Sequence, residues 1–144
     1  MKYNVRFNNE ESKRVYYRTA LTAFAIATLS AGCTSGKTIR APDAPAVSNY
    51  SGPVCFLPAA LPADIKAKKI GDLEAKKESY GGMAKVIQAA ADEARRSGAD
   101  VVADFQTKHR IGFGALAIPV ASGESYKLDD GVTIDCAKLG GTLR

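Results

Sequence analysis

The sequence predicts an α+β domain in which a small, four-stranded mixed sheet carries one helix on one face, preceded by a signal peptide and a flexible tether. Two patterns favour this class: apolar residues at helical spacing after Met83, and short or alternating apolar runs on both sides of that stretch. A chain of 144 residues, 46% hydrophobic and 24% charged, suits one domain and excludes a disordered or polytopic membrane protein. The expected organisation is a signal peptide over 1–32, a tether over 33–53 and a folded domain over 54–144.

The first two strands are expected before the helix. Residues 54–57 form a short apolar run that ends at a proline, which is typical of a buried or edge strand. A second extended segment covers about 65–78, and its alternation changes phase near Gly71 and Asp72, which indicates a bulge. The many lysines of this segment favour a solvated strand face that prevents edge pairing, with a contact to a polyanion or anionic lipid as the alternative.

The helix has the clearest signal in the chain. Its apolar stripe falls at i, i+3, i+4, i+7 and i+11 and consists of Met83, Val86, Ile87, Ala90 and Ala94. Gly98 follows where a left-handed cap is expected, and Arg95 and Arg96 suit the negative end of the helix dipole. Asp92 is spaced to pair with either arginine.

Two more strands are expected after the helix. Val101, Ala103 and Phe105 alternate with Val102, Asp104, Gln106 and Lys108, so one face is apolar and the other mostly polar. The same phase places His109, the single histidine, on the packed side if the strand is regular. The glycines of 112–114 break this strand, and a last strand over about 122–128 returns antiparallel before the turn at 129–131.

The N-terminal segment has the order expected of an export signal. A basic stretch precedes twelve uncharged residues, 20–31, which are too few for a membrane-spanning helix of about 20. The run ends in Leu29-Ser30-Ala31-Gly32-Cys33, which resembles the lipobox of bacterial lipoproteins. This resemblance implies a lipoprotein signal peptide that is removed and a mature chain that begins at Cys33. It also implies lipidation of Cys33 by acyl chains such as palmitate. It departs from the family at Ser30, where Leu, Val or Ile is usual.

The resemblance also implies a location. Two or more acyl chains on one cysteine hold a protein firmly in a bilayer. Thr34 after the cysteine favours the outer membrane, facing the periplasm, over retention at the inner membrane of a bacterial cell envelope. The twenty residues from 34 to 53 contain three prolines and no apolar periodicity, so we expect a lipidated N-terminus and tether over 33–53.

Assigning Cys33 to lipid leaves Cys55 and Cys136 as a pair. In an oxidising compartment a disulfide is expected, and it would close a loop of about 80 residues worth about 4 kcal/mol in the chain-entropy model. Two unrelated buried thiols, or one end of a metal site, are the alternatives. The chain has no CxxC spacing and one histidine, so we expect no metal site and no cofactor.

The net charge of +5 is concentrated in the segment expected to be removed. Residues 1–32 carry five Lys or Arg against two acids, which leaves fifteen against thirteen, or +2, for residues 33–144. A nucleic-acid-binding domain would keep its basic excess, so we expect no nucleic-acid partner.

Within the domain, four segments carry a second resemblance. Tyr80-Gly81-Gly82, Asp92-Glu93-Ala94-Arg95, Gly98-Ala99-Asp100-Val101-Val102 and Gly123-Glu124-Ser125-Tyr126-Lys127-Leu128 are similar to small bacterial heavy-metal-binding-like domains of the YbjQ type. Their relatives among envelope lipoproteins include the Rcs-system outer-membrane stress sensor. The resemblance implies the α+β fold and the capacity to form a homo-oligomer. The chain departs from it in having one cysteine pair where the stress sensor has two disulfides, and no cluster of metal ligands.

No set of residues in the sequence indicates a catalytic site. His109 has no partnered nucleophile nearby in sequence, and the glycines of 112–114 are too sparse for a phosphate loop. We therefore expect a non-enzymatic envelope lipoprotein, an interaction, sensing or structural module with an envelope protein as partner. A small-ligand or metal-binding module that uses His109, the acids and the glycine-bearing loop is the alternative, and the sequence assigns no ligand-binding residue to it.

Overall fold

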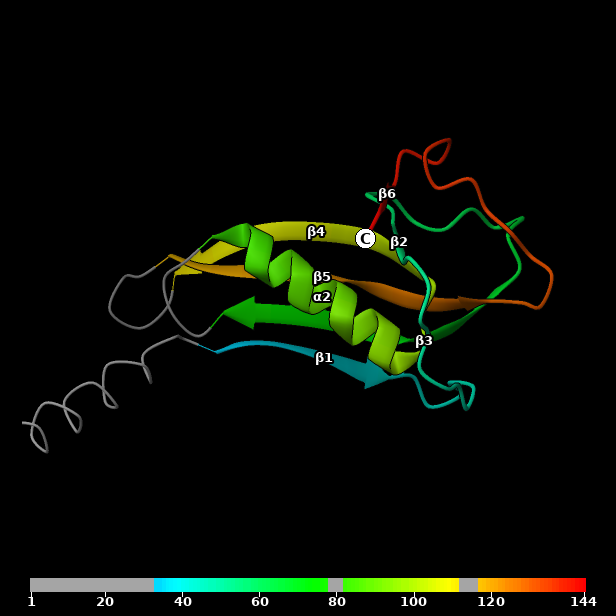
Figure 1. The fold of residues 1–144 in the computed structure, drawn as a ribbon, viewed down its shortest axis with the longest axis horizontal. Helices are drawn as coiled ribbons and strands as arrows, with labels where there is room; N and C mark the ends of the chain where they lie inside the picture. Colours follow the sequence, from blue (N-terminus) through cyan, green and yellow to red (C-terminus); the bar gives the residue numbers. More distant parts are fainter. Residues whose placement is uncertain (1–32, 78–81, 112–116) are drawn as a thin grey trace, which may run out of the picture. The chain divides into compact units, whose positions relative to one another are not determined.

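A computed structural model describes residues 33–77, 82–111 and 117–144 of the chain (Figure 1). The signal peptide expected over 1–32 and the glycines of 112–114 lie outside the described residues. The described part belongs to one structural unit, which spans Gly32–Arg144. The fold class predicted from sequence is confirmed: one helix packs against a mixed sheet.

Within the described residues the sheet has six strands, not the four expected. In chain order the elements are β1 (Thr34–Arg40), β2 (Cys55–Phe56), β3 (Ala67–Lys77), α2 (Met83–Ser97), β4 (Val101–Ile111), β5 (Ala117–Leu128) and β6 (Thr142–Leu143). The spatial order is β1-β3-β5-β4-β2-β6, in which β2 and β4 are parallel and every other neighbouring pair is antiparallel.

The tether expected over 34–53 is wrong for its first part, because residues 34–40 form β1 at one edge of the sheet. β1 pairs with the whole second half of β3, from Thr34 beside Lys77 to Arg40 beside Gly71. The rest of the segment also packs on the domain, where the N–H of Tyr50 donates to the carbonyl of Arg95 at 2.8 Å. With β1 beside residues 71–77, this part of β3 is internal, so Lys76 and Lys77 do not protect an edge as expected, whereas Lys68 and Lys69 precede the paired stretch.

The helix lies across β1, β3 and β5 on one face of the sheet (Figure 1). It ends as predicted, with Gly98 in the left-handed region and its N–H bonded to the carbonyls of Ala94 and Arg95. Small residues allow close approach to β1: a Cβ on Gly36 would lie 2.8 Å from the carbonyl oxygen of Ala89. Asp92 pairs with Arg95 at 3.2 Å, as the spacing predicted.

Two irregularities set which side chains point to which face. The bulge expected near Gly71 is confirmed by a register shift between Lys69 and Gly71. A second shift, between Ala103 and Gln106, was not predicted. It reverses the phase of β4, so Phe105 packs with Val102 on the helix side.

Two predictions about β4 are corrected. Val101 and Phe105 do not share a face, since Val101 packs with Cys55 and Leu57 away from the helix. His109 does lie on the same side of the sheet as Phe105, but its side chain is exposed there and not packed. The last strand is antiparallel to β4 as expected, but it begins at Ala117.

The core has two parts, one on each face of the sheet. Between the helix and the sheet lie Leu73, Ala75, Val86, Ala90 and Val102 with seven other buried residues. On the opposite face a smaller cluster contains Cys55, Leu57, Val101 and Cys136, and the C-terminal segment supplies its cover. The described residues include no helix that is long and apolar enough to span a membrane.

Candidate functional site

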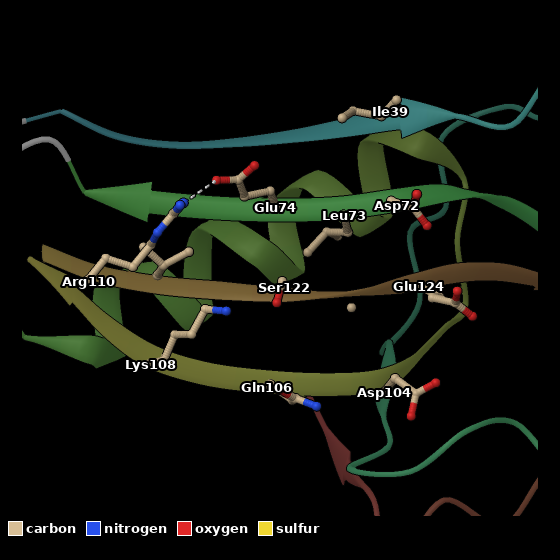
Figure 2. A pocket seen from close by; sticks show the side chains of 12 residues that line it. Ile39, Asp72, Leu73, Glu74, Asp104, Gln106, Lys108, Arg110, Ser122 and Glu124 are labelled. Atoms are coloured by element: carbon tan, nitrogen blue, oxygen red, sulfur yellow. Dashed lines mark ion pairs between the residues drawn. The ribbon is translucent and has the colours of Figure 1, made fainter.

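We call the sheet face opposite α2 the second face. The part of it that the C-terminal segment leaves uncovered forms a groove. Its walls and floor come from β1, β3, β4 and β5, and its volume is about 450 Å³ (Figure 2). The strand pairing explains the polar lining: Asp72 lies beside Glu124, Glu74 beside Ser122 and Gln106 beside Ser122, all on the face away from the helix. We call this surface the open-face groove.

Opposite charges occupy the two ends of the open-face groove. Figure 2 shows Lys108 and Arg110 toward one end and Asp104 and Glu124 toward the other. Between them, Glu74 lies 4.0 Å from Arg110 and 3.7 Å from Lys37, measured from carboxylate oxygen to side-chain nitrogen. Such distances give weak, solvent-screened attraction. The charges of this groove are therefore accessible to a ligand or partner.

Asp104 reaches the acidic end because of the second bulge. Its φ of +48° is in the left-handed region, which aspartate tolerates better than most residues. Its N–H donates to the carbonyl of Ala59 at 2.9 Å, and the N–H of Phe105 donates to the carbonyl of Leu57 at 2.9 Å. Its carboxylate makes no hydrogen bond or ion pair within the described ranges, so the backbone fixes an exposed charge that the fold does not use.

A connected polar network closes the acidic end. The Lys69 ammonium donates to Glu124 at 2.6 Å and lies 2.9 Å from Asp72, and the Tyr126 hydroxyl donates to Glu124 at 2.6 Å. The hydrogen bond from Lys69 lowers the pKa of Glu124, and the bond to Glu124 raises the pKa of Lys69. Burial, and then its bond to Glu124, raise the pKa of Tyr126 to about 12. The side chains of Lys69, Glu124 and Tyr126 thus hold one another in fixed positions.

The cysteines and the histidine singled out from the sequence as candidate site residues do not line this groove. Cys33 is exposed and immediately precedes β1. Cys55 and Cys136 are paired, with sulfur atoms 2.05 Å apart and Cα atoms 5.7 Å apart, on the covered half of the same face. His109 alternates with Lys108 and Arg110 along β4 and does not line the groove.

The groove itself was missed by sequence reasoning. Its residues come from four strands, and a single sequence does not reveal which strands are neighbours. The available signal was the period-2 repeat of Gln106, Lys108 and Arg110, which marks one polar face of a strand.

The arrangement offers charge recognition more readily than catalysis. No histidine or cysteine lines the groove, and Ser122 is its one hydroxyl-bearing residue among those described. Within the described ranges no three His, Cys, Asp or Glu side chains are grouped so that they could hold a metal ion. Comparison of the chain with protein-family models, curated proteins and solved structures finds no match.

Proposed function

We propose that this chain is a bacterial envelope lipoprotein, anchored through Cys33 in the outer membrane and facing the periplasm, whose domain binds an envelope protein without catalysing a reaction. The open-face groove carries the proposal. It is a ready-made surface on rigid strands, its charges are separated along its length, and Asp104 and Lys108 have no ion-pair partner among the described residues. The position of Cys33 before β1 is compatible with an acylated N-terminus.

The groove fits an extended polypeptide segment of mixed charge. Such a segment would place acidic side chains near Lys108 and Arg110 and basic side chains near Asp104 and Glu124. Charge complementarity of this kind sets orientation and association rate more than affinity. A second copy of the chain is one partner of this chemistry, and a different envelope protein is the other.

A photo-crosslinking residue at Gln106, in the groove, tests the interaction in intact cells. We expect a crosslinked product whose mass identifies either a homodimer or a second envelope protein. Gln88 is the matched control: it is exposed on α2, on the other side of the sheet, and should give no such product. Charge reversal by Lys108→Glu should reduce the Gln106 product several-fold at low salt.

The anchor is checked in the same cells. Cys33→Ala should leave the protein unacylated and outside the membrane fraction, with the mass of the N-terminal peptide as readout. Equal crosslinking from positions 106 and 88, or none from either in an acylated chain, would contradict the proposed role of the groove.

A small-ligand site is the second candidate, and the volume of the groove supports it, since pockets for small molecules span about 300–1,000 Å³. It predicts a melting-temperature shift of the wild-type chain with a charged metabolite that Lys108→Glu abolishes. A shift of this kind without a Gln106 crosslink would favour the ligand site over the protein partner.

A further inference from the structure

The end of the sheet that carries Cys33 is strongly basic. β1 begins there beside the end of β3, with Thr34 opposite Lys77, and β4 ends there beside the start of β5, with Ile111 opposite Ala117 (Figure 1). The first turn of α2 lies at the same end. Among described residues this end holds two acids, Glu74 in β3 and Glu93, which lies against Gly36 of β1. It holds six basic side chains: Lys37, Lys76, Lys77, Lys85, Lys108 and Arg110. We call it the basic end.

The rest of the domain has nearly balanced charges. Outside the basic end, the described residues include ten Asp or Glu and nine Lys or Arg. The small net charge of the domain therefore conceals a separation along the strands, with positive charge gathered where Cys33 lies. Several basic side chains here are exposed, including Lys85 and Lys108, so their charges face solvent and are accessible to an anionic surface.

We propose that the basic end rests on a bilayer surface of anionic glycerophospholipid. The inference depends on the proposed acylation of Cys33, because acyl chains there leave almost no slack: β1 starts one residue later, and a residue spans at most about 3.6 Å. The anchored domain then holds its basic end at the headgroups, where each Lys or Arg is attracted by the surface potential. The far end of the sheet, where charges nearly balance, points away from the membrane.

Ile111 adds an apolar contact at this end. Its side chain is 88% exposed, the most exposed of the large hydrophobic residues in the described part of the chain. An exposed isoleucine that follows Lys108 and Arg110 on the same strand has the composition of membrane-surface contacts, in which apolar groups enter the interface and cations remain at the phosphates. The open-face groove begins at the same end, through Lys108 and Arg110, so a bound partner would extend from the membrane toward the far end.

The test uses the mature, acylated chain purified from membranes and reconstituted in vesicles. A fluorophore is attached at Ile111→Cys or, as the far-end control, at Asp130→Cys in the exposed turn after β5. The vesicles contain phosphatidylcholine with or without phosphatidylglycerol and a nitroxide-labelled lipid as quencher. We expect quenching at position 111 to exceed that at position 130 at least threefold, and to fall when phosphatidylglycerol is omitted. Equal quenching at both positions overturns the inference.

Two charge-matched variants separate this contact from general electrostatics. Lys77→Glu with Lys85→Glu removes basic residues from the basic end, outside the groove, and should lower quenching at position 111 at least twofold. Lys66→Glu with Lys68→Glu makes the same change in net charge at the far end of β3 and should leave the quenching unchanged. Equal effects of the two pairs would contradict the proposal.

Failure of the anchor and failure of this inference have different signatures. An N-terminal peptide without acyl mass shows that the proposed anchor is wrong and removes the inference with it. An acylated chain with equal quenching at positions 111 and 130 leaves the anchor standing and overturns only the orientation.

Discussion

The two faces of the sheet are made from the same strands but are closed by different means. The face under α2 is filled by small and branched apolar side chains such as Ala75, Ala121 and Val102. The other face has a small apolar cluster around Cys55 and Cys136 and, beside it, the polar open-face groove. The alternation of side chains along a strand is therefore not enough to decide which residues are buried. A strand residue is buried where something covers it, and the uncovered part of the second face is where charge remains available.

Removing the disulfide should cause the largest loss of stability, and it should act on the second face. Replacing Cys55 and Cys136 by alanine together opens a loop of 81 residues and should lower the free energy of unfolding by about 4 kcal/mol. The cover of the second face should loosen first, because the pairing of the C-terminal segment with the sheet is short: the two residues of β6 pair with the two residues of β2. Urea denaturation followed by circular dichroism measures the loss.

Cys33→Ala is the control for the disulfide variant, since Cys33 is exposed and outside the pair. It should unfold with the wild-type midpoint. If reduction of the wild-type chain left the midpoint unchanged, the pair would not be a stabilising disulfide, and the second face would be held by apolar packing alone.

The next effect compares neighbouring residues on opposite faces. Leu73 is 1% exposed and packs under α2, and Leu73→Ala should cost about 3 kcal/mol of unfolding free energy through lost burial and a cavity. Glu74 is next in sequence but faces the groove, where its ion pairs are long. Glu74→Ala should change stability by no more than about 0.5 kcal/mol. A similar loss for both variants would show that the open face is structural and not a surface kept for binding.

The sequence revealed the helix-covered face much better than the open face. The stripe from Met83 to Ala94 and the cap at Gly98 are local signals, and local geometry alone decides them. The phase change at Gly71 was visible in the alternation of β3 itself, but the reason for glycine was not: a Cβ there would lie 2.1 Å from the carbonyl oxygen of Ile39 in β1.

The open face depended on features that have no local signal. β1 was missed because its helix-facing positions include Gly36 and Thr38, which do not produce an apolar alternation, although they suit a closely packed edge strand. The bulge at Asp104 was missed because a non-glycine residue takes the left-handed conformation there. Hydrogen bonds that the N–H groups of Asp104 and Phe105 donate to the carbonyls of Ala59 and Leu57 hold it in place. These partners are about 45 residues away in sequence, so only the tertiary fold specifies them.

The smallest effect concerns the Lys69, Glu124 and Tyr126 network, which marks the boundary between the covered and uncovered parts of the second face. Because the pKa of Glu124 is lowered in the folded state, its stabilisation is present above pH 4.5 and is lost as the pH falls through the lower folded value. Because the pKa of Lys69 is raised above 10.5 and that of Tyr126 from 10.0 to about 12, their contributions are present below about pH 10 and are lost as the pH rises.

Glu124→Gln should therefore destabilise the chain most between about pH 5 and pH 9, and progressively less outside that window. The difference should stay below about 1 kcal/mol, because Lys69 and Glu124 are each 36% exposed and solvent screens the pair. Denaturation of both chains across the pH range gives the profile, and Tyr126→Phe, which keeps the ion pair, should flatten only part of the alkaline side. A difference independent of pH would mean that Glu124 acts through packing, and that the boundary between the two parts of the second face is not set by charge.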